Sequence, residues 1–154
     1  MSNLPYRVGI PMVGADSSGE QWPARLLGAH NIERSKAGLA PFAGWPRLDL
    51  VAQARVEDMV RGGYFAHVDP DNTPGDYAAV LAQHGIRYAW AGENLAANNY
   101  SDDAVTRAMV TWMNSPTHRD NVLFPGFDTM GGAAAVRPDG AILMAVVFVG
   151  GAAL

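Results

Sequence analysis

The sequence of 154 residues contains no cysteine. Disulfide bridges, cysteine-ligated zinc and iron–sulfur clusters are therefore excluded. Charged residues make up only 17% of the chain and apolar residues 49%, a composition that is typical of a folded domain rather than a disordered segment. The length fits one domain, which at this size buries about 70% of the surface that the unfolded chain exposes.

Basic residues are few and dispersed: Lys36 is the only lysine, and the formal net charge is −4. Binders of nucleic acid or of membrane surfaces usually carry a clustered basic patch, so we expect neither partner. The longest apolar run, residues 141–149, is shorter than the roughly 20 residues of a membrane-spanning helix, and the first residues lack the pattern of a signal peptide. A monomer is the default expectation.

Hydrophobic periodicity predicts helices first and a hairpin last. Residues 1–21 are expected to form a loosely ordered arm before a single domain over residues 22–154. Helices are expected from Pro23 to Gly38, from Pro46 to Gly62, from Pro74 to His84, and from a Ser101 cap to the residue before Pro116. Small apolar residues 130–136, a turn at 137–140 and the apolar run that follows predict an antiparallel hairpin. This order favours an α+β domain whose sheet is covered by helices.

Three polar residues stand in segments rich in Gly, Pro and Asn, which we expect to be loops: His67, Glu93 and His118. Function concentrates in such loops. Ser115 and Pro116 resemble a helix start, which would make His118 the third helical residue and favour its neutral imidazole. Spacing alone does not establish a metal site, because no His-x-x-x-His pattern is present. Capping or core-edge roles for both histidines, and a locally hydrogen-bonded Glu93, remain open.

The other two histidines are expected to be structural. His84 precedes Gly85 and fits the C-terminus of a helix, where it would interact with the helix dipole. His30 is expected to pack within the first helix, and Met109 and Trp112 to belong to the core.

Several short motifs recur in the order of a known family. They are Asn31-x-x-Arg34, Phe65-x-His67, Gly92-Glu93-Asn94-Leu95-Ala96, Trp112-Met113-Asn114-Ser115-Pro116-x-His118-Arg119 and Gly131-Gly132. Over residues 26–148 the sequence resembles the bacterial branch of the CAP superfamily, the SCP-like extracellular proteins related to cysteine-rich secretory proteins.

The resemblance implies a three-layer α–β–α sandwich with a small, mostly antiparallel sheet and a cleft lined by His67, Glu93 and His118. Some members of the family hold zinc between two histidines, so a weak or optional zinc site at these residues is implied. Asn31 and Arg34 would be structural supports. The family also implies a location in the periplasm or outside the cell.

Three functions remain open. The leading hypothesis is an exported binding module, of unknown ligand, in which His67, His118, Glu93 and water complete a four-coordinate zinc shell. The first alternative is a peptide or ester hydrolase in which these residues, with or without metal, activate water and Glu93 is the general base; no Ser, Cys or Thr nucleophile is visibly paired with a base. The second alternative is a surface module for lipid, glycan or peptide, with a purely structural His/Glu network.

Overall fold

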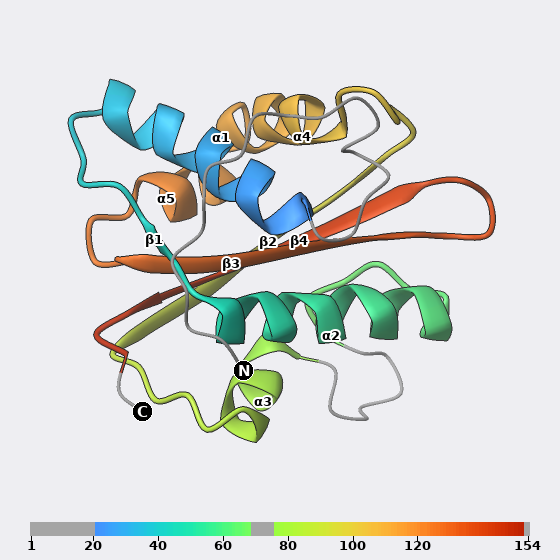
Figure 1. Ribbon diagram of the computed structural model, residues 1–154, viewed down its shortest axis with the longest axis horizontal. Coiled ribbons are helices and arrows are strands. Elements are labelled where there is room, and N and C mark those ends of the chain that lie inside the picture. Colours follow the sequence, from blue (N-terminus) through green and yellow to red (C-terminus); the bar gives the residue numbers. More distant parts are fainter. Residues whose placement is uncertain (1–20, 69–75, 153–154) are drawn as a thin grey trace.

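A four-stranded sheet lies between two layers of helices in the computed structural model, which describes residues 21–68 and 76–152 (Figure 1). One face carries α1 (Trp22–Lys36), α4 (Ala104–Met113) and α5 (Pro116–Leu123), and the other carries α2 (Pro46–Gly62) and α3 (Tyr77–Gln83). The predicted α+β sandwich of three layers is confirmed. Except for residue 21, the arm predicted at residues 1–21 lies outside the described part of the chain.

The sheet is mixed, with one short parallel pair. Its strands are β1 (Ala43–Gly44), β2 (Trp90–Asn98), β3 (Thr129–Val136) and β4 (Ile142–Gly150), in the spatial order β1-β3-β4-β2. The predicted hairpin is β3–β4, which pairs antiparallel, and β2 also pairs antiparallel with β4. Only β1 pairs parallel, over two residues. Beyond β1, the carboxylate of Asp49 in α2 accepts a hydrogen bond from the backbone N–H of Gly132 at 3.0 Å.

Two glycines in β3 set the spacing of the three layers. A Cβ at Gly131 would lie 2.2 Å from the backbone carbon of Leu48 in α2, and one at Gly132 would lie 2.7 Å from Leu26 Cδ1 in α1. Side chains at these two positions alternate between the faces of the sheet. The Gly131–Gly132 pair therefore allows a helix to approach the same strand from each side.

The helix starts differ from prediction in two places. Helix α4 begins at Ala104, because Asp103 rather than Ser101 occupies the N-cap position, and the Asp103 carboxylate pairs with Arg107 at 3.0 Å instead of capping. Helix α3 begins at Tyr77, capped by Asp76, so the predicted start at Pro74 falls outside the described residues. Helices α1 and α2 lie where their N-terminal prolines and C-terminal glycines predict.

Apolar side chains fill the space on both sides of the sheet, and Met109 and Trp112 belong to the core between the sheet and α1, α4 and α5. His30 is fully buried in that core, with its ring 5.4 Å from Trp112 and 5.6 Å from Phe148. Its Nδ1 lies 2.7 Å from the carbonyl oxygen of Leu26, while Nε2 has no hydrogen-bond partner among the described residues. Burial lowers the pKa of His30 to about 4.

His30 is expected to make the fold sensitive to acid. Its pKa in the folded state lies below its unfolded value of 6.5, so the unfolded chain takes up this proton first as the pH falls. Stability that is fully present above pH 6.5 is then lost between pH 6.5 and 4, by up to roughly 3 kcal/mol. Urea unfolding of the wild type and of His30→Leu at pH 7.5, 5.5 and 4.5 measures the effect. Parallel pH profiles for the two proteins would contradict it.

Candidate functional site

Glu93 lies in the middle of strand β2, not in a loop as its Gly and Asn neighbours suggested. Those neighbours have specific places in the strand. Gly92 leaves room for the Phe127 ring, which would lie 3.0 Å from a Cβ, and buried Asn94 donates its side-chain amide to the carbonyl of His118 at 3.0 Å. Tertiary contacts thus keep a segment of low strand propensity in the sheet.

The carboxylate of Glu93 is held by Arg55, a residue that the sequence analysis did not single out. Arg55 Nε and Nη2 donate to the two carboxylate oxygens at 2.8 and 3.1 Å, and both side chains are completely buried. Burial lowers the pKa of Arg55, but the hydrogen bonds and charge of Glu93 outweigh it and leave that pKa above its ordinary value. The sequence carried a signal: Arg55 stands between Val51 and Met59 on the buried stripe of α2.

His67 is fixed by the same ion pair. Its Nδ1 lies 2.9 Å from Glu93 Oε1, and because an ionised carboxylate only accepts, Nδ1 is the donor. Arg55 Nη2 also donates to the carbonyl oxygens of Ala66 and His67 at 2.8 and 3.0 Å. The His67 side chain is 52% exposed. Buried side chains therefore hold both the ring and the backbone of His67, while the rest of the ring is exposed to solvent.

His118 lies in the first turn of α5, as predicted, and Ser115 occupies the N-cap position of that helix, but its side chain makes no capping hydrogen bond. The Ser115 hydroxyl instead lies 2.8 Å from His118 Nδ1. The backbone of His118 is tied to β2 by Asn94, whose side-chain oxygen accepts from the amide of Asn121 at 2.9 Å. Burial, and next the nearby imidazole of His67, lower the pKa of His118. Its neutral form is favoured, as the sequence analysis expected from the helix dipole.

The two imidazoles line one cavity of about 370 Å³, which we call the histidine hollow. His67 reaches it from the segment after α2 and His118 from α5, so the two rings come from opposite helical layers. The remaining wall is Phe65, Ala66, Leu95, Ala96, Ala97, Asn98, Ala108 and Thr111. Glu93 is not part of the wall, because it lies behind His67 on Arg55.

Two of the three predicted zinc ligands, His67 and His118, line the same hollow, and imidazole is a common zinc ligand. Both oxygens of the third, Glu93, already accept hydrogen bonds from Arg55. No group of three or more His, Asp or Glu side chains within residues 21–68 and 76–152 is arranged to hold a metal ion. The complete set of His67, His118 and Glu93 as ligands therefore stays a prediction.

The remaining motif residues make structural contacts. The side chain of Asn31 bonds both backbone groups of Phe42, at 3.1 and 2.7 Å. Arg34 donates to the carbonyl oxygens of Ala40 at 2.7 Å, Val122 at 3.0 Å and Phe124 at 3.1 Å. These side chains join α1 to the β1 segment and to the end of α5. His84 Nδ1 lies 2.9 Å from the Val80 carbonyl at the end of α3, the place expected for it.

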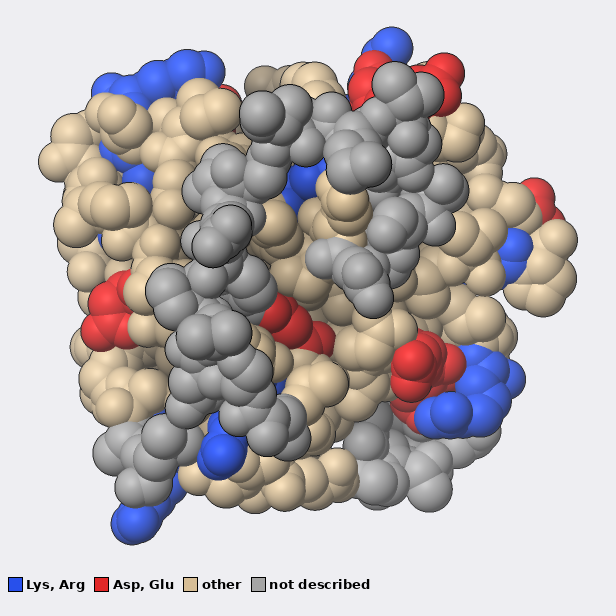
Figure 2. Space-filling view, viewed as in Figure 1, with Lys and Arg blue, Asp and Glu red and all other residues tan. Residues whose placement is uncertain are grey.

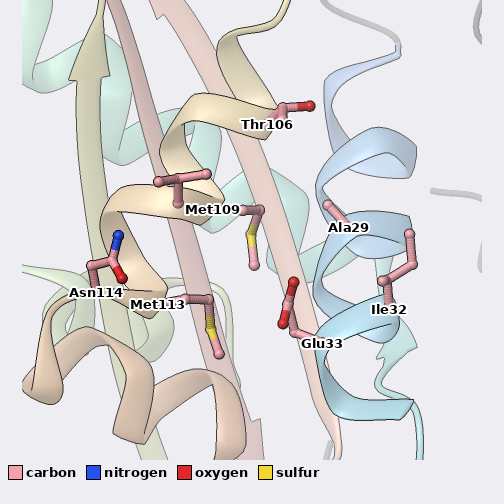
Figure 3. Close-up of a pocket in the computed structure, with 8 residues that line it drawn as sticks. Ala29, Ile32, Glu33, Thr106, Met109, Met113 and Asn114 are labelled. Atoms are coloured by element: carbon pink, nitrogen blue, oxygen red, sulfur yellow. The ribbon is translucent and has the colours of Figure 1, made fainter. Parts of the chain in front are cut away.

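A second cavity of about 360 Å³, the α1–α4 groove, lies on the outer side of the helical layer. Figure 3 shows Ala29, Ile32 and Glu33 of α1 facing Met109 and Met113 of α4, with Thr106 and Asn114 at its ends. Ile32 is 59% exposed, although it is a large apolar residue. The groove is mainly apolar and distinct in its lining residues from the histidine hollow.

Charged side chains on the face seen in Figure 2 form small, separate groups, several of which contain both signs. Two ion pairs on the surface join residues of one helix, Lys36–Glu33 in α1 and Arg61–Asp58 in α2. None of the helices in the described part of the chain is long and apolar enough to cross a membrane.

Comparison with known proteins agrees with the fold and the motifs. The family described as cysteine-rich secretory proteins, or CAP, matches residues 27–150. The uncharacterized protein YkwD of Bacillus subtilis (strain 168) is 36% identical over 117 residues, which are 76% of this chain and 44% of that protein.

Solved structures have the same fold. An extracellular protein of Bacillus anthracis strain Ames that contains a SCP domain superposes with a TM-score of 0.70 at 27% identity, over 86% of this chain and 41% of that one. The crystal structure of NaASP2 with Zn²⁺ superposes with a TM-score of 0.58 at 13% identity, over 91% and 83% of the two chains.

The chain spans less than half the length of the two Bacillus relatives. Within that span the family match covers both motif histidines, Glu93 and all four strands. The chain belongs to the cysteine-rich secretory protein (CAP) family.

Proposed function

We propose that this chain is an exported binding module whose histidine hollow takes a divalent metal ion, zinc first of all. The observation that supports it is that His67 and His118 line the same cavity. In each histidine Nδ1 is hydrogen-bonded to a neighbouring side chain. That arrangement leaves Nε2 of each ring as the nitrogen for coordination. Bound zinc would supply Lewis acidity and an attachment point for a ligand group.

In this proposal Glu93 does not coordinate the metal ion but orients the metal ligand His67. Histidines that bind metals usually donate their other ring N–H to a carboxylate, which fixes the ring and raises its basicity. Glu93 stands in that relation to His67, and Arg55 keeps the carboxylate in place. With only two protein ligands, water or the bound ligand completes the zinc shell, so weak occupancy is expected.

An exported location is proposed from family membership and from the extracellular Bacillus anthracis relative. Zinc is the ion to test first, because a protein of the same fold has been crystallised with it. The metal would be replaced by protons at low pH, since both ligands must be neutral to bind. Because the pKa of His118 is lowered, protons displace the metal from this ring only in more acidic solution.

Zinc titration calorimetry at pH 7.5 is expected to give one site per chain. His67→Ala and His118→Ala should each weaken the affinity at least about tenfold, because each removes one of two protein ligands. His84→Ala is the matched control, since its ring lies at the end of α3 outside the hollow. Equal heats for the wild type and the His67→Ala/His118→Ala double variant would reject the site.

The Arg55–Glu93 pair is expected to control zinc affinity separately from stability. Removing one partner, as in Glu93→Gln, leaves a buried charge and should cost about 3–5 kcal/mol. The apolar double variant Arg55→Met/Glu93→Leu leaves no unpaired buried charge and should lose less stability than Glu93→Gln, yet bind zinc roughly 10–100-fold more weakly because His67 loses its support. Urea unfolding and calorimetry measure the two effects. A folded double variant with wild-type affinity would disprove the positioning role.

A second binding function is favoured by the α1–α4 groove. Its mainly apolar lining, which includes two flexible methionines, suits an acyl chain, and at either end Thr106 or Asn114 offers a hydrogen bond to a carboxylate head. We therefore propose that a fatty acid can occupy this groove independently of the histidine hollow.

A fluorescent fatty acid is expected to bind the wild type and to be displaced by palmitate. Ala29→Phe fills the groove and should weaken this binding at least about tenfold, because the acyl chain loses its apolar contacts. Ala82→Phe, a matched change on the exposed side of α3, should have no effect. Equal binding by all three proteins would place the fatty acid elsewhere.

A further inference from the structure

Strand β2 lies at one edge of the sheet, with β4 on its only paired side. In a strand, the N–H and C=O of one residue point to the same side, and successive residues alternate. Every second residue of β2 therefore directs its backbone groups away from β4. These groups are either satisfied by the protein itself or free for another chain.

Side-chain hydrogen bonds identify the outward residues of β2. Trp112 Nε1 donates to the carbonyl oxygen of Leu95 at 2.9 Å, and Asn121 donates to that of Glu93 at 3.4 Å. Since both donors belong to the covering helices, the odd-numbered residues face outward. The rest of the sheet agrees: the even-numbered Gly150 of β4 accepts from the β2 side, through Ala89 N–H, and the odd-numbered Val149 accepts from the β3 side, through Asp128 N–H.

Ala97 is the next outward residue of the strand. No hydrogen bond among residues 21–68 and 76–152 uses its outward N–H or C=O. Its side chain is exposed, and no residue of β2 after Glu93 is charged or a proline, whereas such residues commonly blunt an edge strand.

Ala97 also lies where two cavities meet. A cavity of about 540 Å³ beside α4, which we call the α4 hollow, shares Ala97, Asn98 and Thr111 with the histidine hollow. The α4 hollow continues past Tyr100 and Arg107, whose guanidinium carbon lies 4.4 Å from the centre of the tyrosine ring. An elongated ligand can therefore run along the strand edge from one hollow into the other.

We propose that the edge of β2 at Ala97 binds an extended peptide, which exchanges one pair of backbone hydrogen bonds with this residue. Strand addition of this kind obtains affinity from the main chain and specificity from alternate side chains. The inference rests on the proposed binding function of the histidine hollow, but it does not require a metal ion.

The lining of the two hollows defines the peptide. Neighbouring side chains of an added strand point to opposite faces of the sheet, one toward Phe65 and His67 and the next toward Thr111. Phe65 is 45% exposed at the mouth of the histidine hollow, a suitable contact for an apolar side chain. In the α4 hollow Arg107 is already paired with Asp103 at 3.0 Å. Uncharged peptides with an apolar residue should therefore bind best.

The probe is a mixture of acetylated, amidated heptapeptides of uncharged residues, incubated with the protein in EDTA and analysed by affinity selection and mass spectrometry. Selected peptides should lose roughly tenfold or more in affinity for Ala97→Pro, which deletes the outward N–H without removing a ladder bond. Ala97→Ser keeps the N–H and should bind like the wild type. A selected peptide N-methylated at its central residue should fail against the wild-type protein, a test that does not depend on the folding of the proline variant.

Three results would overturn the proposal. One is that the protein selects no peptide although it binds zinc as expected; the peptide proposal then fails and the metal proposal stands. Another is undiminished binding by Ala97→Pro or by the N-methylated peptide. The third is a wild-type dimer in analytical ultracentrifugation that Ala97→Pro converts to a monomer, since the edge would then be occupied by a second copy.

Discussion

The buried ion pair between Arg55 and Glu93 determines how the histidine hollow is built. Two charges without solvent exposure are costly unless their hydrogen bonds are complete. Glu93 meets this condition with Arg55 and His67, and Arg55 meets it with Glu93, Tyr64 and two backbone carbonyls. The pair thereby joins a helix, the central part of an edge strand and the segment that carries His67.

The other side of the hollow depends on neutral hydrogen bonds. Asn94 and Asn121 link β2 to α5, and Trp112 reaches the same strand from α4. These groups face the opposite side of the sheet from Glu93, because neighbouring strand residues alternate. Neighbouring residues of β2 thus position the two histidines: Glu93 holds the ring of His67, and Asn94 holds the backbone of His118. A common strand therefore places two imidazoles that are 51 positions apart in the chain.

Local signals predicted α1 and α2 well, since a proline at the start and a glycine at the end act within a few residues. They failed for β2, where Gly and Asn beside Glu93 indicate a loop; its strand conformation depends on pairing with β4, some fifty residues later. The motif resemblance brought His67, Glu93 and His118 together, but not Arg55. An arginine on an apolar helical stripe needs buried acceptors. For Arg34 they are backbone carbonyls and for Arg55 they include the carboxylate of Glu93, and nothing local tells the two cases apart. The partner of Ser115 was missed because a helix cap is the commoner role of that residue.

The two edges of the sheet have different consequences for assembly. Beyond the two residues of β1, the carboxylate of Asp49 takes the backbone donor of Gly132 that another strand would otherwise use, and Ala134 farther along is buried. Among the described residues, the β2 edge at Ala97 carries an outward N–H and C=O without a hydrogen-bond partner, whereas at Gly132 the outward donor is already bonded. Two molecules that pair through their β2 edges would fill this position in both at once, as a closed two-fold contact does.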